Sequence, residues 1–392
     1  MVTLAIDYQN RITTVMPSAE PKYSSDRGVA LVRHDKHIVQ TCIPLLLHPD
    51  EQVQRQATLL LLTLYGTHAF TLLRRRLSDE KPYVRREAEQ ALRVLGRQSG
   101  HPVDFRPFRG MHVECLGTLR VYIGNQEILS HEWAQSNVSR AGRRKVQAVL
   151  AYLVHRGRSG ASADEIRAAV WGEASATGAL GRTLTALRQT IEHFGGTSMA
   201  ESLLNSSNQR YILTPDDYTS DVRSFEHTIR VAEQTEHDRD LAAAAPVYRH
   251  ACDLYGGPFM ADVDILTDEI EERRTELLNA YLTALERLAE YAYQQGDDEQ
   301  CLALCRRGIR FDPTDERLTL WMLRCYARQR NESEIARVFR RYLRALATPP
   351  DQGDAVVRWM RLRSGAHNEA VDITTQYLPS SENHAPHRHD AP

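Results

Sequence analysis

The sequence lacks the features that mark several classes of enzyme. Its 392 residues contain no G-x-x-x-x-G-K-[ST] phosphate loop and no H-E-x-x-H zinc-binding pair. Six cysteines at irregular spacing do not form a disulfide framework, which favours a reducing cytoplasm. These absences argue against an NTPase and a metallohydrolase, and we expect no catalytic activity, no metal and no cofactor.

Long hydrophobic runs are also missing. The longest aliphatic run is 59–62, far below the ~20 residues that span a bilayer. Asp7 and Arg11 stand where a signal peptide would need an apolar core. The sequence therefore predicts a cytoplasmic protein with no membrane contact.

Charge is balanced over the whole chain but not along it. The net charge is -2, with 42% hydrophobic and 26% charged residues, which is typical of a globular protein. Between Arg140 and Arg158, however, six basic residues occur without one acidic residue. A run of this kind is usually a solvated surface, but it can also contact nucleic acid.

Residues 111–214 follow the order of a winged helix. A hairpin pattern at 111–123 is broken by Gly117 and turns at 124–125, and a first helix lies within 140–158. Helical patterns at 164–171 and 179–194 come next, and 208–213 can form one leg of a wing. The third helix of such a unit is the one shaped to enter a DNA major groove.

The pattern in 179–194 separates an inward from an outward face. Arg182 and Gln189 lie opposite the apolar stripe, and Ser175 or Thr177 can cap the helix. The alternative is the solvated face of an ordinary helix. The stripe consists of Leu180, Leu184, Leu187 and Ile191, and the outward pair is flanked by Gly178, Thr185, Ala186 and His193.

Other basic residues are predicted beside this helix. Arg140, Arg143, Arg144 and Lys145 sit where a winged helix can meet the phosphate backbone, which positions a protein without reading sequence. Arg210 lies in the predicted wing, where it can reach a minor groove.

Helical repeats flank the winged helix on both sides. Residues 36–100 contain a 31-residue offset that matches Val53, Ala57 and Leu61 to residues of the same type, and the segment resembles HEAT repeats. Residues 221–347 contain an offset of thirty-four residues, the tetratricopeptide period. Residues 1–35 are expected to be a poorly ordered lead-in, and 348–392 a C-terminal extension with a disordered tail.

Three cysteines in the second array admit two interpretations. Cys301 and Cys305 lie four residues apart, and Cys325 follows twenty residues later, so a metal site is conceivable. By the thirty-four-residue offset, however, Cys301 and Cys305 are equivalent to Ile335 and Phe339, which are packing residues. Buried structural thiols are therefore favoured.

Taken in order, these segments resemble the SARP class of bacterial transcription regulators. That class joins an OmpR-type winged helix to a bacterial transcriptional activator domain, and the resemblance covers residues 108–345. It rests on 113–117, 144–153, Val-Trp-Gly-Glu at 170–173, 179–180, 187–188 and 210–213. The sequence departs from the family pattern at Gly181, where the family often has Gln, and at Ala186, where it often has Arg.

Together with the repeat patterns, the resemblance implies a mainly α fold: HEAT-like repeats, an α+β winged helix at 105–220 and a tetratricopeptide-like array. It implies a DNA-binding transcriptional regulator, an activator, with double-stranded DNA and RNA polymerase as partners and with the array used for dimerisation or partner contact. The alternative is a protein-interaction scaffold with a degenerate winged helix. The predicted DNA-binding residues are Arg140, Arg143, Arg144, Lys145, Thr177, Arg182, Thr185, Arg188, Gln189 and Arg210.

Overall fold

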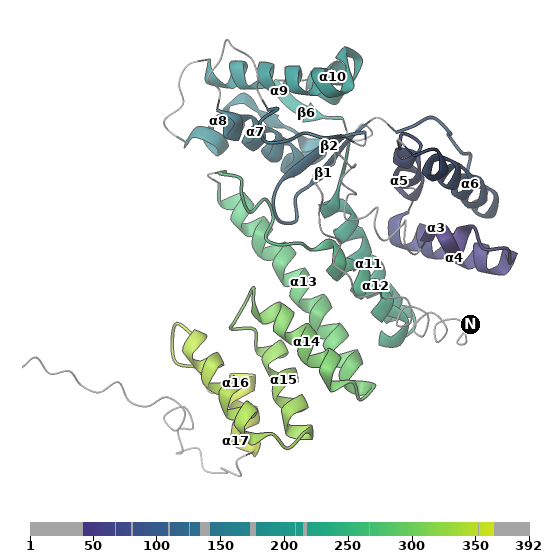
Figure 1. Ribbon diagram of the computed structural model, residues 1–392. Helices are drawn as coiled ribbons and strands as arrows, with labels where there is room; N and C mark the ends of the chain where they lie inside the picture. The colour runs from purple at the N-terminus through teal and green to yellow at the C-terminus, as the bar shows by residue number, and fades with distance from the viewer. Residues whose placement is uncertain are drawn as a thin grey trace, which may run out of the picture.

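The computed structural model describes residues 42–363, apart from 67, 80, 109, 125, 134–141, 173–177, 208, 215–217, 266 and 352. Three groups of elements follow one another: an N-terminal helical block, a winged helix and a C-terminal helical array (Figure 1). The fold is mainly α with two small sheets, as the sequence predicts. The expected lead-in and the disordered tail lie outside the described residues.

The N-terminal block is a pair of helical repeats. The 31-residue offset pairs helix α4 with helix α6, and Ala57 and Ala88 are both buried at equivalent positions. Asp50 caps α4 by accepting from the backbone of Gln52. The elements are α3 (Ile43–Leu46), α4 (Glu51–Tyr65), α5 (His68–Arg76) and α6 (Pro82–Ser99).

This block packs on the rest of the chain. The Arg75 guanidinium is buried, donates to the carbonyl of Gly124 and lies 6.0 Å from the Tyr122 ring centroid. On the other side, the Thr228 hydroxyl donates to the carbonyl of Leu64. The block therefore contacts both the winged helix and the first helix of the C-terminal array, as expected for two repeats that cannot cover their own apolar face.

The winged helix has the predicted order of elements. A four-stranded sheet has the order β3-β2-β1-β7, and a three-stranded sheet, β4-β6-β5, forms the wing. An added short helix, α10, follows the third helix and has no counterpart in the sequence prediction. The elements are β1 (Met111–Glu114), β2 (Arg120–Ile123), β3 (Gln126–Glu127), α7 (Arg143–Arg156), β4 (Ala161–Ser162), α8 (Ala163–Trp171), α9 (Ala179–Gly195), α10 (Thr197–Leu203), β5 (Leu204–Ser207), β6 (Arg210–Leu213) and β7 (Tyr218–Ser220).

Antiparallel-packed helices make up the C-terminal array. The thirty-four-residue offset pairs α14 with α16, and the three cysteines Cys301, Cys305 and Cys325 are fully buried, which confirms them as packing residues. No group of side chains in the described residues could hold a metal ion. The helices are α11 (Asp221–Asp238), α12 (Leu241–Leu254), α13 (Asp268–Gln294), α14 (Asp298–Ile309), α15 (Glu316–Arg328), α16 (Glu332–Ala345) and α17 (Ala355–Arg363).

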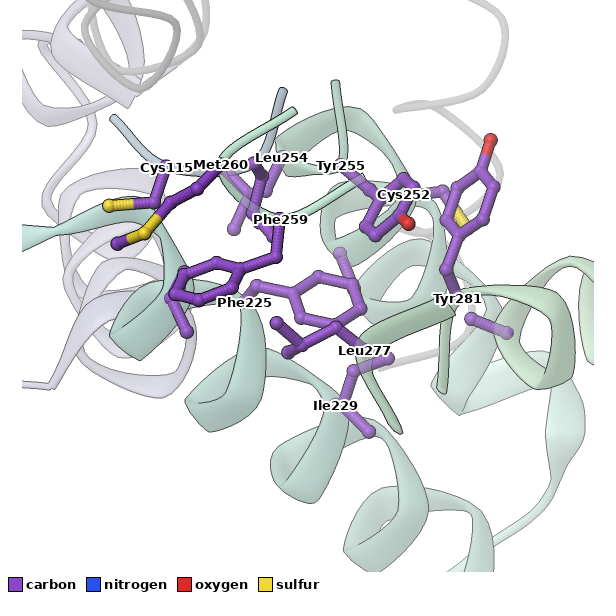
Figure 2. Packing of buried hydrophobic residues seen from close by; sticks show 14 of the residues in the cluster. Cys115, Phe225, Ile229, Cys252, Leu254, Tyr255, Phe259, Met260, Leu277 and Tyr281 are labelled. Atoms are coloured by element: carbon purple, nitrogen blue, oxygen red, sulfur yellow. The ribbon is translucent and has the colours of Figure 1, made fainter. Parts of the chain in front are cut away.

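The winged helix and the array share one core. Strand β7 runs parallel to β1 and leads directly into α11, and the loop before α13 returns to the sheet, where Met260 donates its N–H to the carbonyl of Cys115 at 2.7 Å. Phe225 from α11 and Leu277 from α13 are buried together with Phe259 and Met260, which belong to this loop (Figure 2). The predicted domain boundary at 220/221 therefore lies where the winged helix and the array pack against each other.

Among the described residues, no single helix is long and apolar enough to cross a membrane. Helix α4 and residues 69–76 reach that length and composition only together, across a bend of 105°.

Candidate nucleic-acid interface

Helix α9 presents one face to the core and the other to solvent. The predicted stripe of Leu180, Leu184, Leu187 and Ile191 is buried, none of the four being more than 4% exposed. Helices α7 and α8 and strand β2 contact this side. Figure 1 shows α9 along the upper edge of the molecule, at the far end from α14–α17, so that its outward face is open.

The outward face of α9 carries polar side chains at helical spacing. Arg182, Thr185, Arg188 and Gln189 are all exposed. Within the described part of the chain, the side chains of Arg182, Arg188 and Gln189 make no hydrogen bond or ion pair, whereas the Thr185 hydroxyl donates to the carbonyl of Gly181 at 2.9 Å. Two guanidinium groups and one amide are therefore free to contact a ligand.

Two details of α9 differ from the sequence prediction. Ala186, expected beside the outward face, is buried with 1% exposure, because α10 folds back and contacts a second side of the helix. Thr190 is buried on the same side and donates to the carbonyl of Ala186. The N-cap is Gly178 in the left-handed region, φ 78°, with no side-chain cap, while the predicted caps Ser175 and Thr177 lie outside the described residues.

The start of α7 supplies a second basic cluster. Arg143 and Arg144 are exposed, and Arg143 donates to the carbonyl of Ser130 at 3.1 Å. Lys145 is instead half-buried: its ammonium donates to the carbonyl of Val170 and lies 5.9 Å from the Trp171 ring centroid. Lys145 therefore ties α7 to α8. Arg140 lies outside the described residues.

The predicted wing arginine is held within the fold. Arg210 donates to the carbonyls of Ser159 and Gly160, each at 2.9 Å, and forms an ion pair with Glu165 at 2.9 Å. This placement follows from the sheet, because β4 pairs with β6 and sets Ser162 opposite Arg210. The structure thus separates Arg210 from the free arginines of α9.

Glu165 is the centre of this arrangement. Its carboxylate accepts the backbone N–H of Ser162, which completes a capping box at the start of α8, and it also pairs with Arg156. The Ser162 backbone hydrogen bond lowers the pKa of Glu165, so that the carboxylate stays charged. These contacts place Arg210 to hold β6 against the start of α8, and they hold its guanidinium within the fold.

The wing tip exposes polar, uncharged side chains that the pattern of basic residues does not indicate. Ser206 and Gln209 are exposed there, and Gln209 adopts a left-handed conformation, φ 62°. The sequence indicates this tip only as a polar turn between two strands. Such a turn predicts a hairpin but does not indicate which ligand the hairpin contacts.

The described residues thus join a winged helix, whose third helix has an exposed polar face, to an array of helical hairpins. Residues 220–350 match the family model of the bacterial transcriptional activator domain. The fold is similar to the solved structure of Mycobacterium tuberculosis EmbR in complex with a low-affinity phosphopeptide, with a TM-score of 0.51, 20% identity and coverage of 68% of each chain. A comparison with curated proteins finds no match.

At this identity the structural likeness shows a shared fold, and the family match is limited to residues 220–350. Both findings agree with the predicted resemblance to SARP-type regulators, whose activator domain is expected at 221–347.

Proposed function

We propose that this protein is a SARP-type transcriptional regulator that binds duplex DNA through the outward face of α9 and activates transcription in the cytoplasm. One observation carries the proposal: Arg182, Arg188 and Gln189 are exposed and make no side-chain hydrogen bond or ion pair with a described residue, and Arg182 and Gln189 lie opposite a fully buried stripe. Arginine can form two hydrogen bonds with guanine and glutamine can form two with adenine, and a helix fits the major groove. The short polar chain of Thr185 lets the helix approach the bases closely.

Arg143 and Arg144 support the proposal as backbone contacts. They lie at the first turn of α7, with Arg144 making no side-chain hydrogen bond or ion pair to any described residue. Such arginines neutralise phosphates and displace counterions, so binding should weaken as salt is raised. Thr177 and Arg140 remain part of the proposed interface on sequence grounds.

The array gives the regulator a second surface. A single winged helix reads few bases, and two copies on half-sites about one helical turn apart would double the readout. We propose dimerisation or contact with RNA polymerase through the α11–α17 array. The shared core with β1 and β7 would transmit such contacts to the winged helix without a flexible linker.

The test is recovery of genomic fragments by the full-length protein, followed by gel retardation on the recovered DNA. The variant R182A/R188A should lose preference for the recovered fragments, while the control R239A/R249A should retain it. Arg239 and Arg249 are equally exposed and likewise form no ion pair with a described residue, but they lie on the array. Failure of the wild-type protein to retard any fragment at low salt would exclude this function.

A further inference from the structure

Charge is divided sharply within the C-terminal array. Residues 221–297 contain seventeen acidic residues against seven arginines, whereas 298–363, which hold α14–α17, contain fourteen arginines against nine acidic residues. Neither segment contains lysine. The net charge of the whole chain is close to zero, but α14–α17 carry an excess of arginine.

The basic residues of these helices follow the internal repeat. Arg306 and Arg307 on α14 and Arg310 at its C-cap recur thirty-four residues later as Arg340, Arg341 and Arg344 on α16. The repeat of a three-arginine pattern is not needed for packing, because the buried residues of these helices are apolar or thiol side chains at other positions. We define the basic end by four of these residues: Arg306, Arg310, Arg340 and Arg344.

All four of these side chains are exposed, and none forms an ion pair with a described residue. Arg306 donates to the Tyr326 hydroxyl at 2.9 Å and Arg340 to the carbonyl of Ala336 at 3.2 Å, which leaves further guanidinium donors open. By contrast, Arg307 is only partly exposed and lies 3.8 Å from Asp253. Arg306 interacts electrostatically with Glu334, whereas no ion pair with a described residue balances Arg310, Arg340 or Arg344.

Arginines of α14 and α16 meet over α15, which contacts both helices. Arg306 from α14 reaches Tyr326, and Arg341 from α16 reaches Met322 one turn earlier on α15, with the Arg341 nitrogen 3.6 Å from sulfur. Burial, together with the neighbouring Arg337, lowers the pKa of Arg341, in keeping with crowded positive charge. Arginines near a helix C-terminus also interact favourably with the helix dipole, but this effect is weak for exposed side chains. It does not explain why the same arginine pattern occurs at the ends of both α14 and α16.

The position of the basic end in the molecule favours protein carboxylates over DNA phosphates as its ligand. The basic end and α9 lie at opposite ends of the molecule (Figure 1), so straight DNA held by α9 does not reach α14–α17. Residues 306 and 310 are one turn apart, about 6 Å along the axis, as are 340 and 344. Glutamates at i and i+4 on a facing helix have the same spacing, and arginine forks bind carboxylates with two parallel hydrogen bonds.

We propose that the basic end is a docking surface for an acidic helix of a partner protein, with carboxylates one helical turn apart. The contact would place that partner at the far side of the array from DNA. This proposal does not depend on DNA binding by α9, and the two can fail separately.

The experiment measures fluorescence anisotropy of full-length protein with a labelled helical peptide that carries Glu at every fourth position. The variant R306Q/R310Q/R340Q/R344Q should weaken binding roughly tenfold, as expected from the loss of four exposed charge contacts. The matched variant R182Q/R188Q on α9 should bind the peptide as the wild type does. Thermal melts of each variant report whether the fold is retained.

Two further arms keep the result unambiguous. The reversed variant R310E/R344E should bind the same peptide with Lys in place of Glu, which a variant that simply misfolds would not do. Equal peptide binding by wild type and the four-residue variant would overturn the proposal. So would an equal loss of affinity for noncognate duplex DNA, because the basic end would then be a nucleic-acid surface.

Discussion

The carboxylate of Asp221 accepts the backbone N–H of Cys115 at 2.7 Å, although 106 residues separate the two in sequence. Asp221 also accepts from Leu116 at 2.9 Å and from Val222 at 2.8 Å, and its side chain is buried. It is the first residue of α11, so one carboxylate joins the end of β1 to the start of the array. This contact makes the winged helix and the array a single mechanical unit.

Replacing Asp221 with Ala should lower the free energy of unfolding by about 1–3 kcal/mol, because buried N–H groups of Cys115 and Leu116 lose their acceptor. Urea denaturation of the full-length protein measures the change. Asp264→Ala serves as the control, since Asp264 is exposed and makes no side-chain hydrogen bond with a described residue. Equal midpoints for the two variants would contradict the assigned role.

Stability should also depend on pH through Asp221. Burial raises its pKa from the ordinary value of 3.8 to about 7, so the folded protein binds this proton more tightly than the unfolded chain. The contribution is therefore complete below about pH 4 and is lost as the pH rises to about 7. The stability difference between wild type and Asp221→Ala should shrink over this range, and a difference that grows with pH would refute the assignment.

Gly181→Ala should stabilise α9 by up to about 1 kcal/mol, because glycine is unfavourable within a helix. No atom of a described residue lies within 4 Å of a Cβ built at this position. The control Gly160→Ala should destabilise, since its Cβ would meet the Tyr211 carbonyl oxygen at 2.6 Å and φ is +59°. Thermal melts distinguish the two, and a loss of stability at Gly181 would show that the helix start needs its flexibility.

Arg143 and Arg144 should contribute affinity without sequence preference. Replacing both with Ala is expected to weaken binding to all duplexes and to flatten the dependence of the binding constant on salt. Arg182→Ala should instead relax preference at one base position, by about 1–3 kcal/mol. Titrations at several salt concentrations separate the effects, and identical salt slopes for the double variant and wild type would remove the phosphate role.

Arg330→Gly should raise the free energy of unfolding by roughly 0.5–1 kcal/mol, because Arg330 adopts φ +54°, which glycine tolerates better. The equivalent residue one repeat earlier is Gly296, with φ +79°. Gly296→Ala should accordingly destabilise by a similar amount. Melting temperatures that move in the same direction for both variants would contradict the repeat-based argument.

Much of the fold was predictable because its signals are local. The 100° spacing of Leu180, Leu184, Leu187 and Ile191 predicts both the existence of α9 and the face that it buries. The two repeat offsets predict which helices are equivalent, since each repeat is a short unit that packs on its neighbours. The outward positions of Arg182, Arg188 and Gln189 follow from the same periodicity.

The sequence by itself determined the class of each segment, the order of the three parts and the polar face of α9. Only the tertiary structure decided that Ala186 is covered, that Arg210 is bound by Glu165 and that Asp221 joins two parts of the chain. The reason is physical: helical periodicity is fixed by neighbours along the chain, whereas burial and pairing of a side chain depend on elements that reach it from distant positions in the sequence.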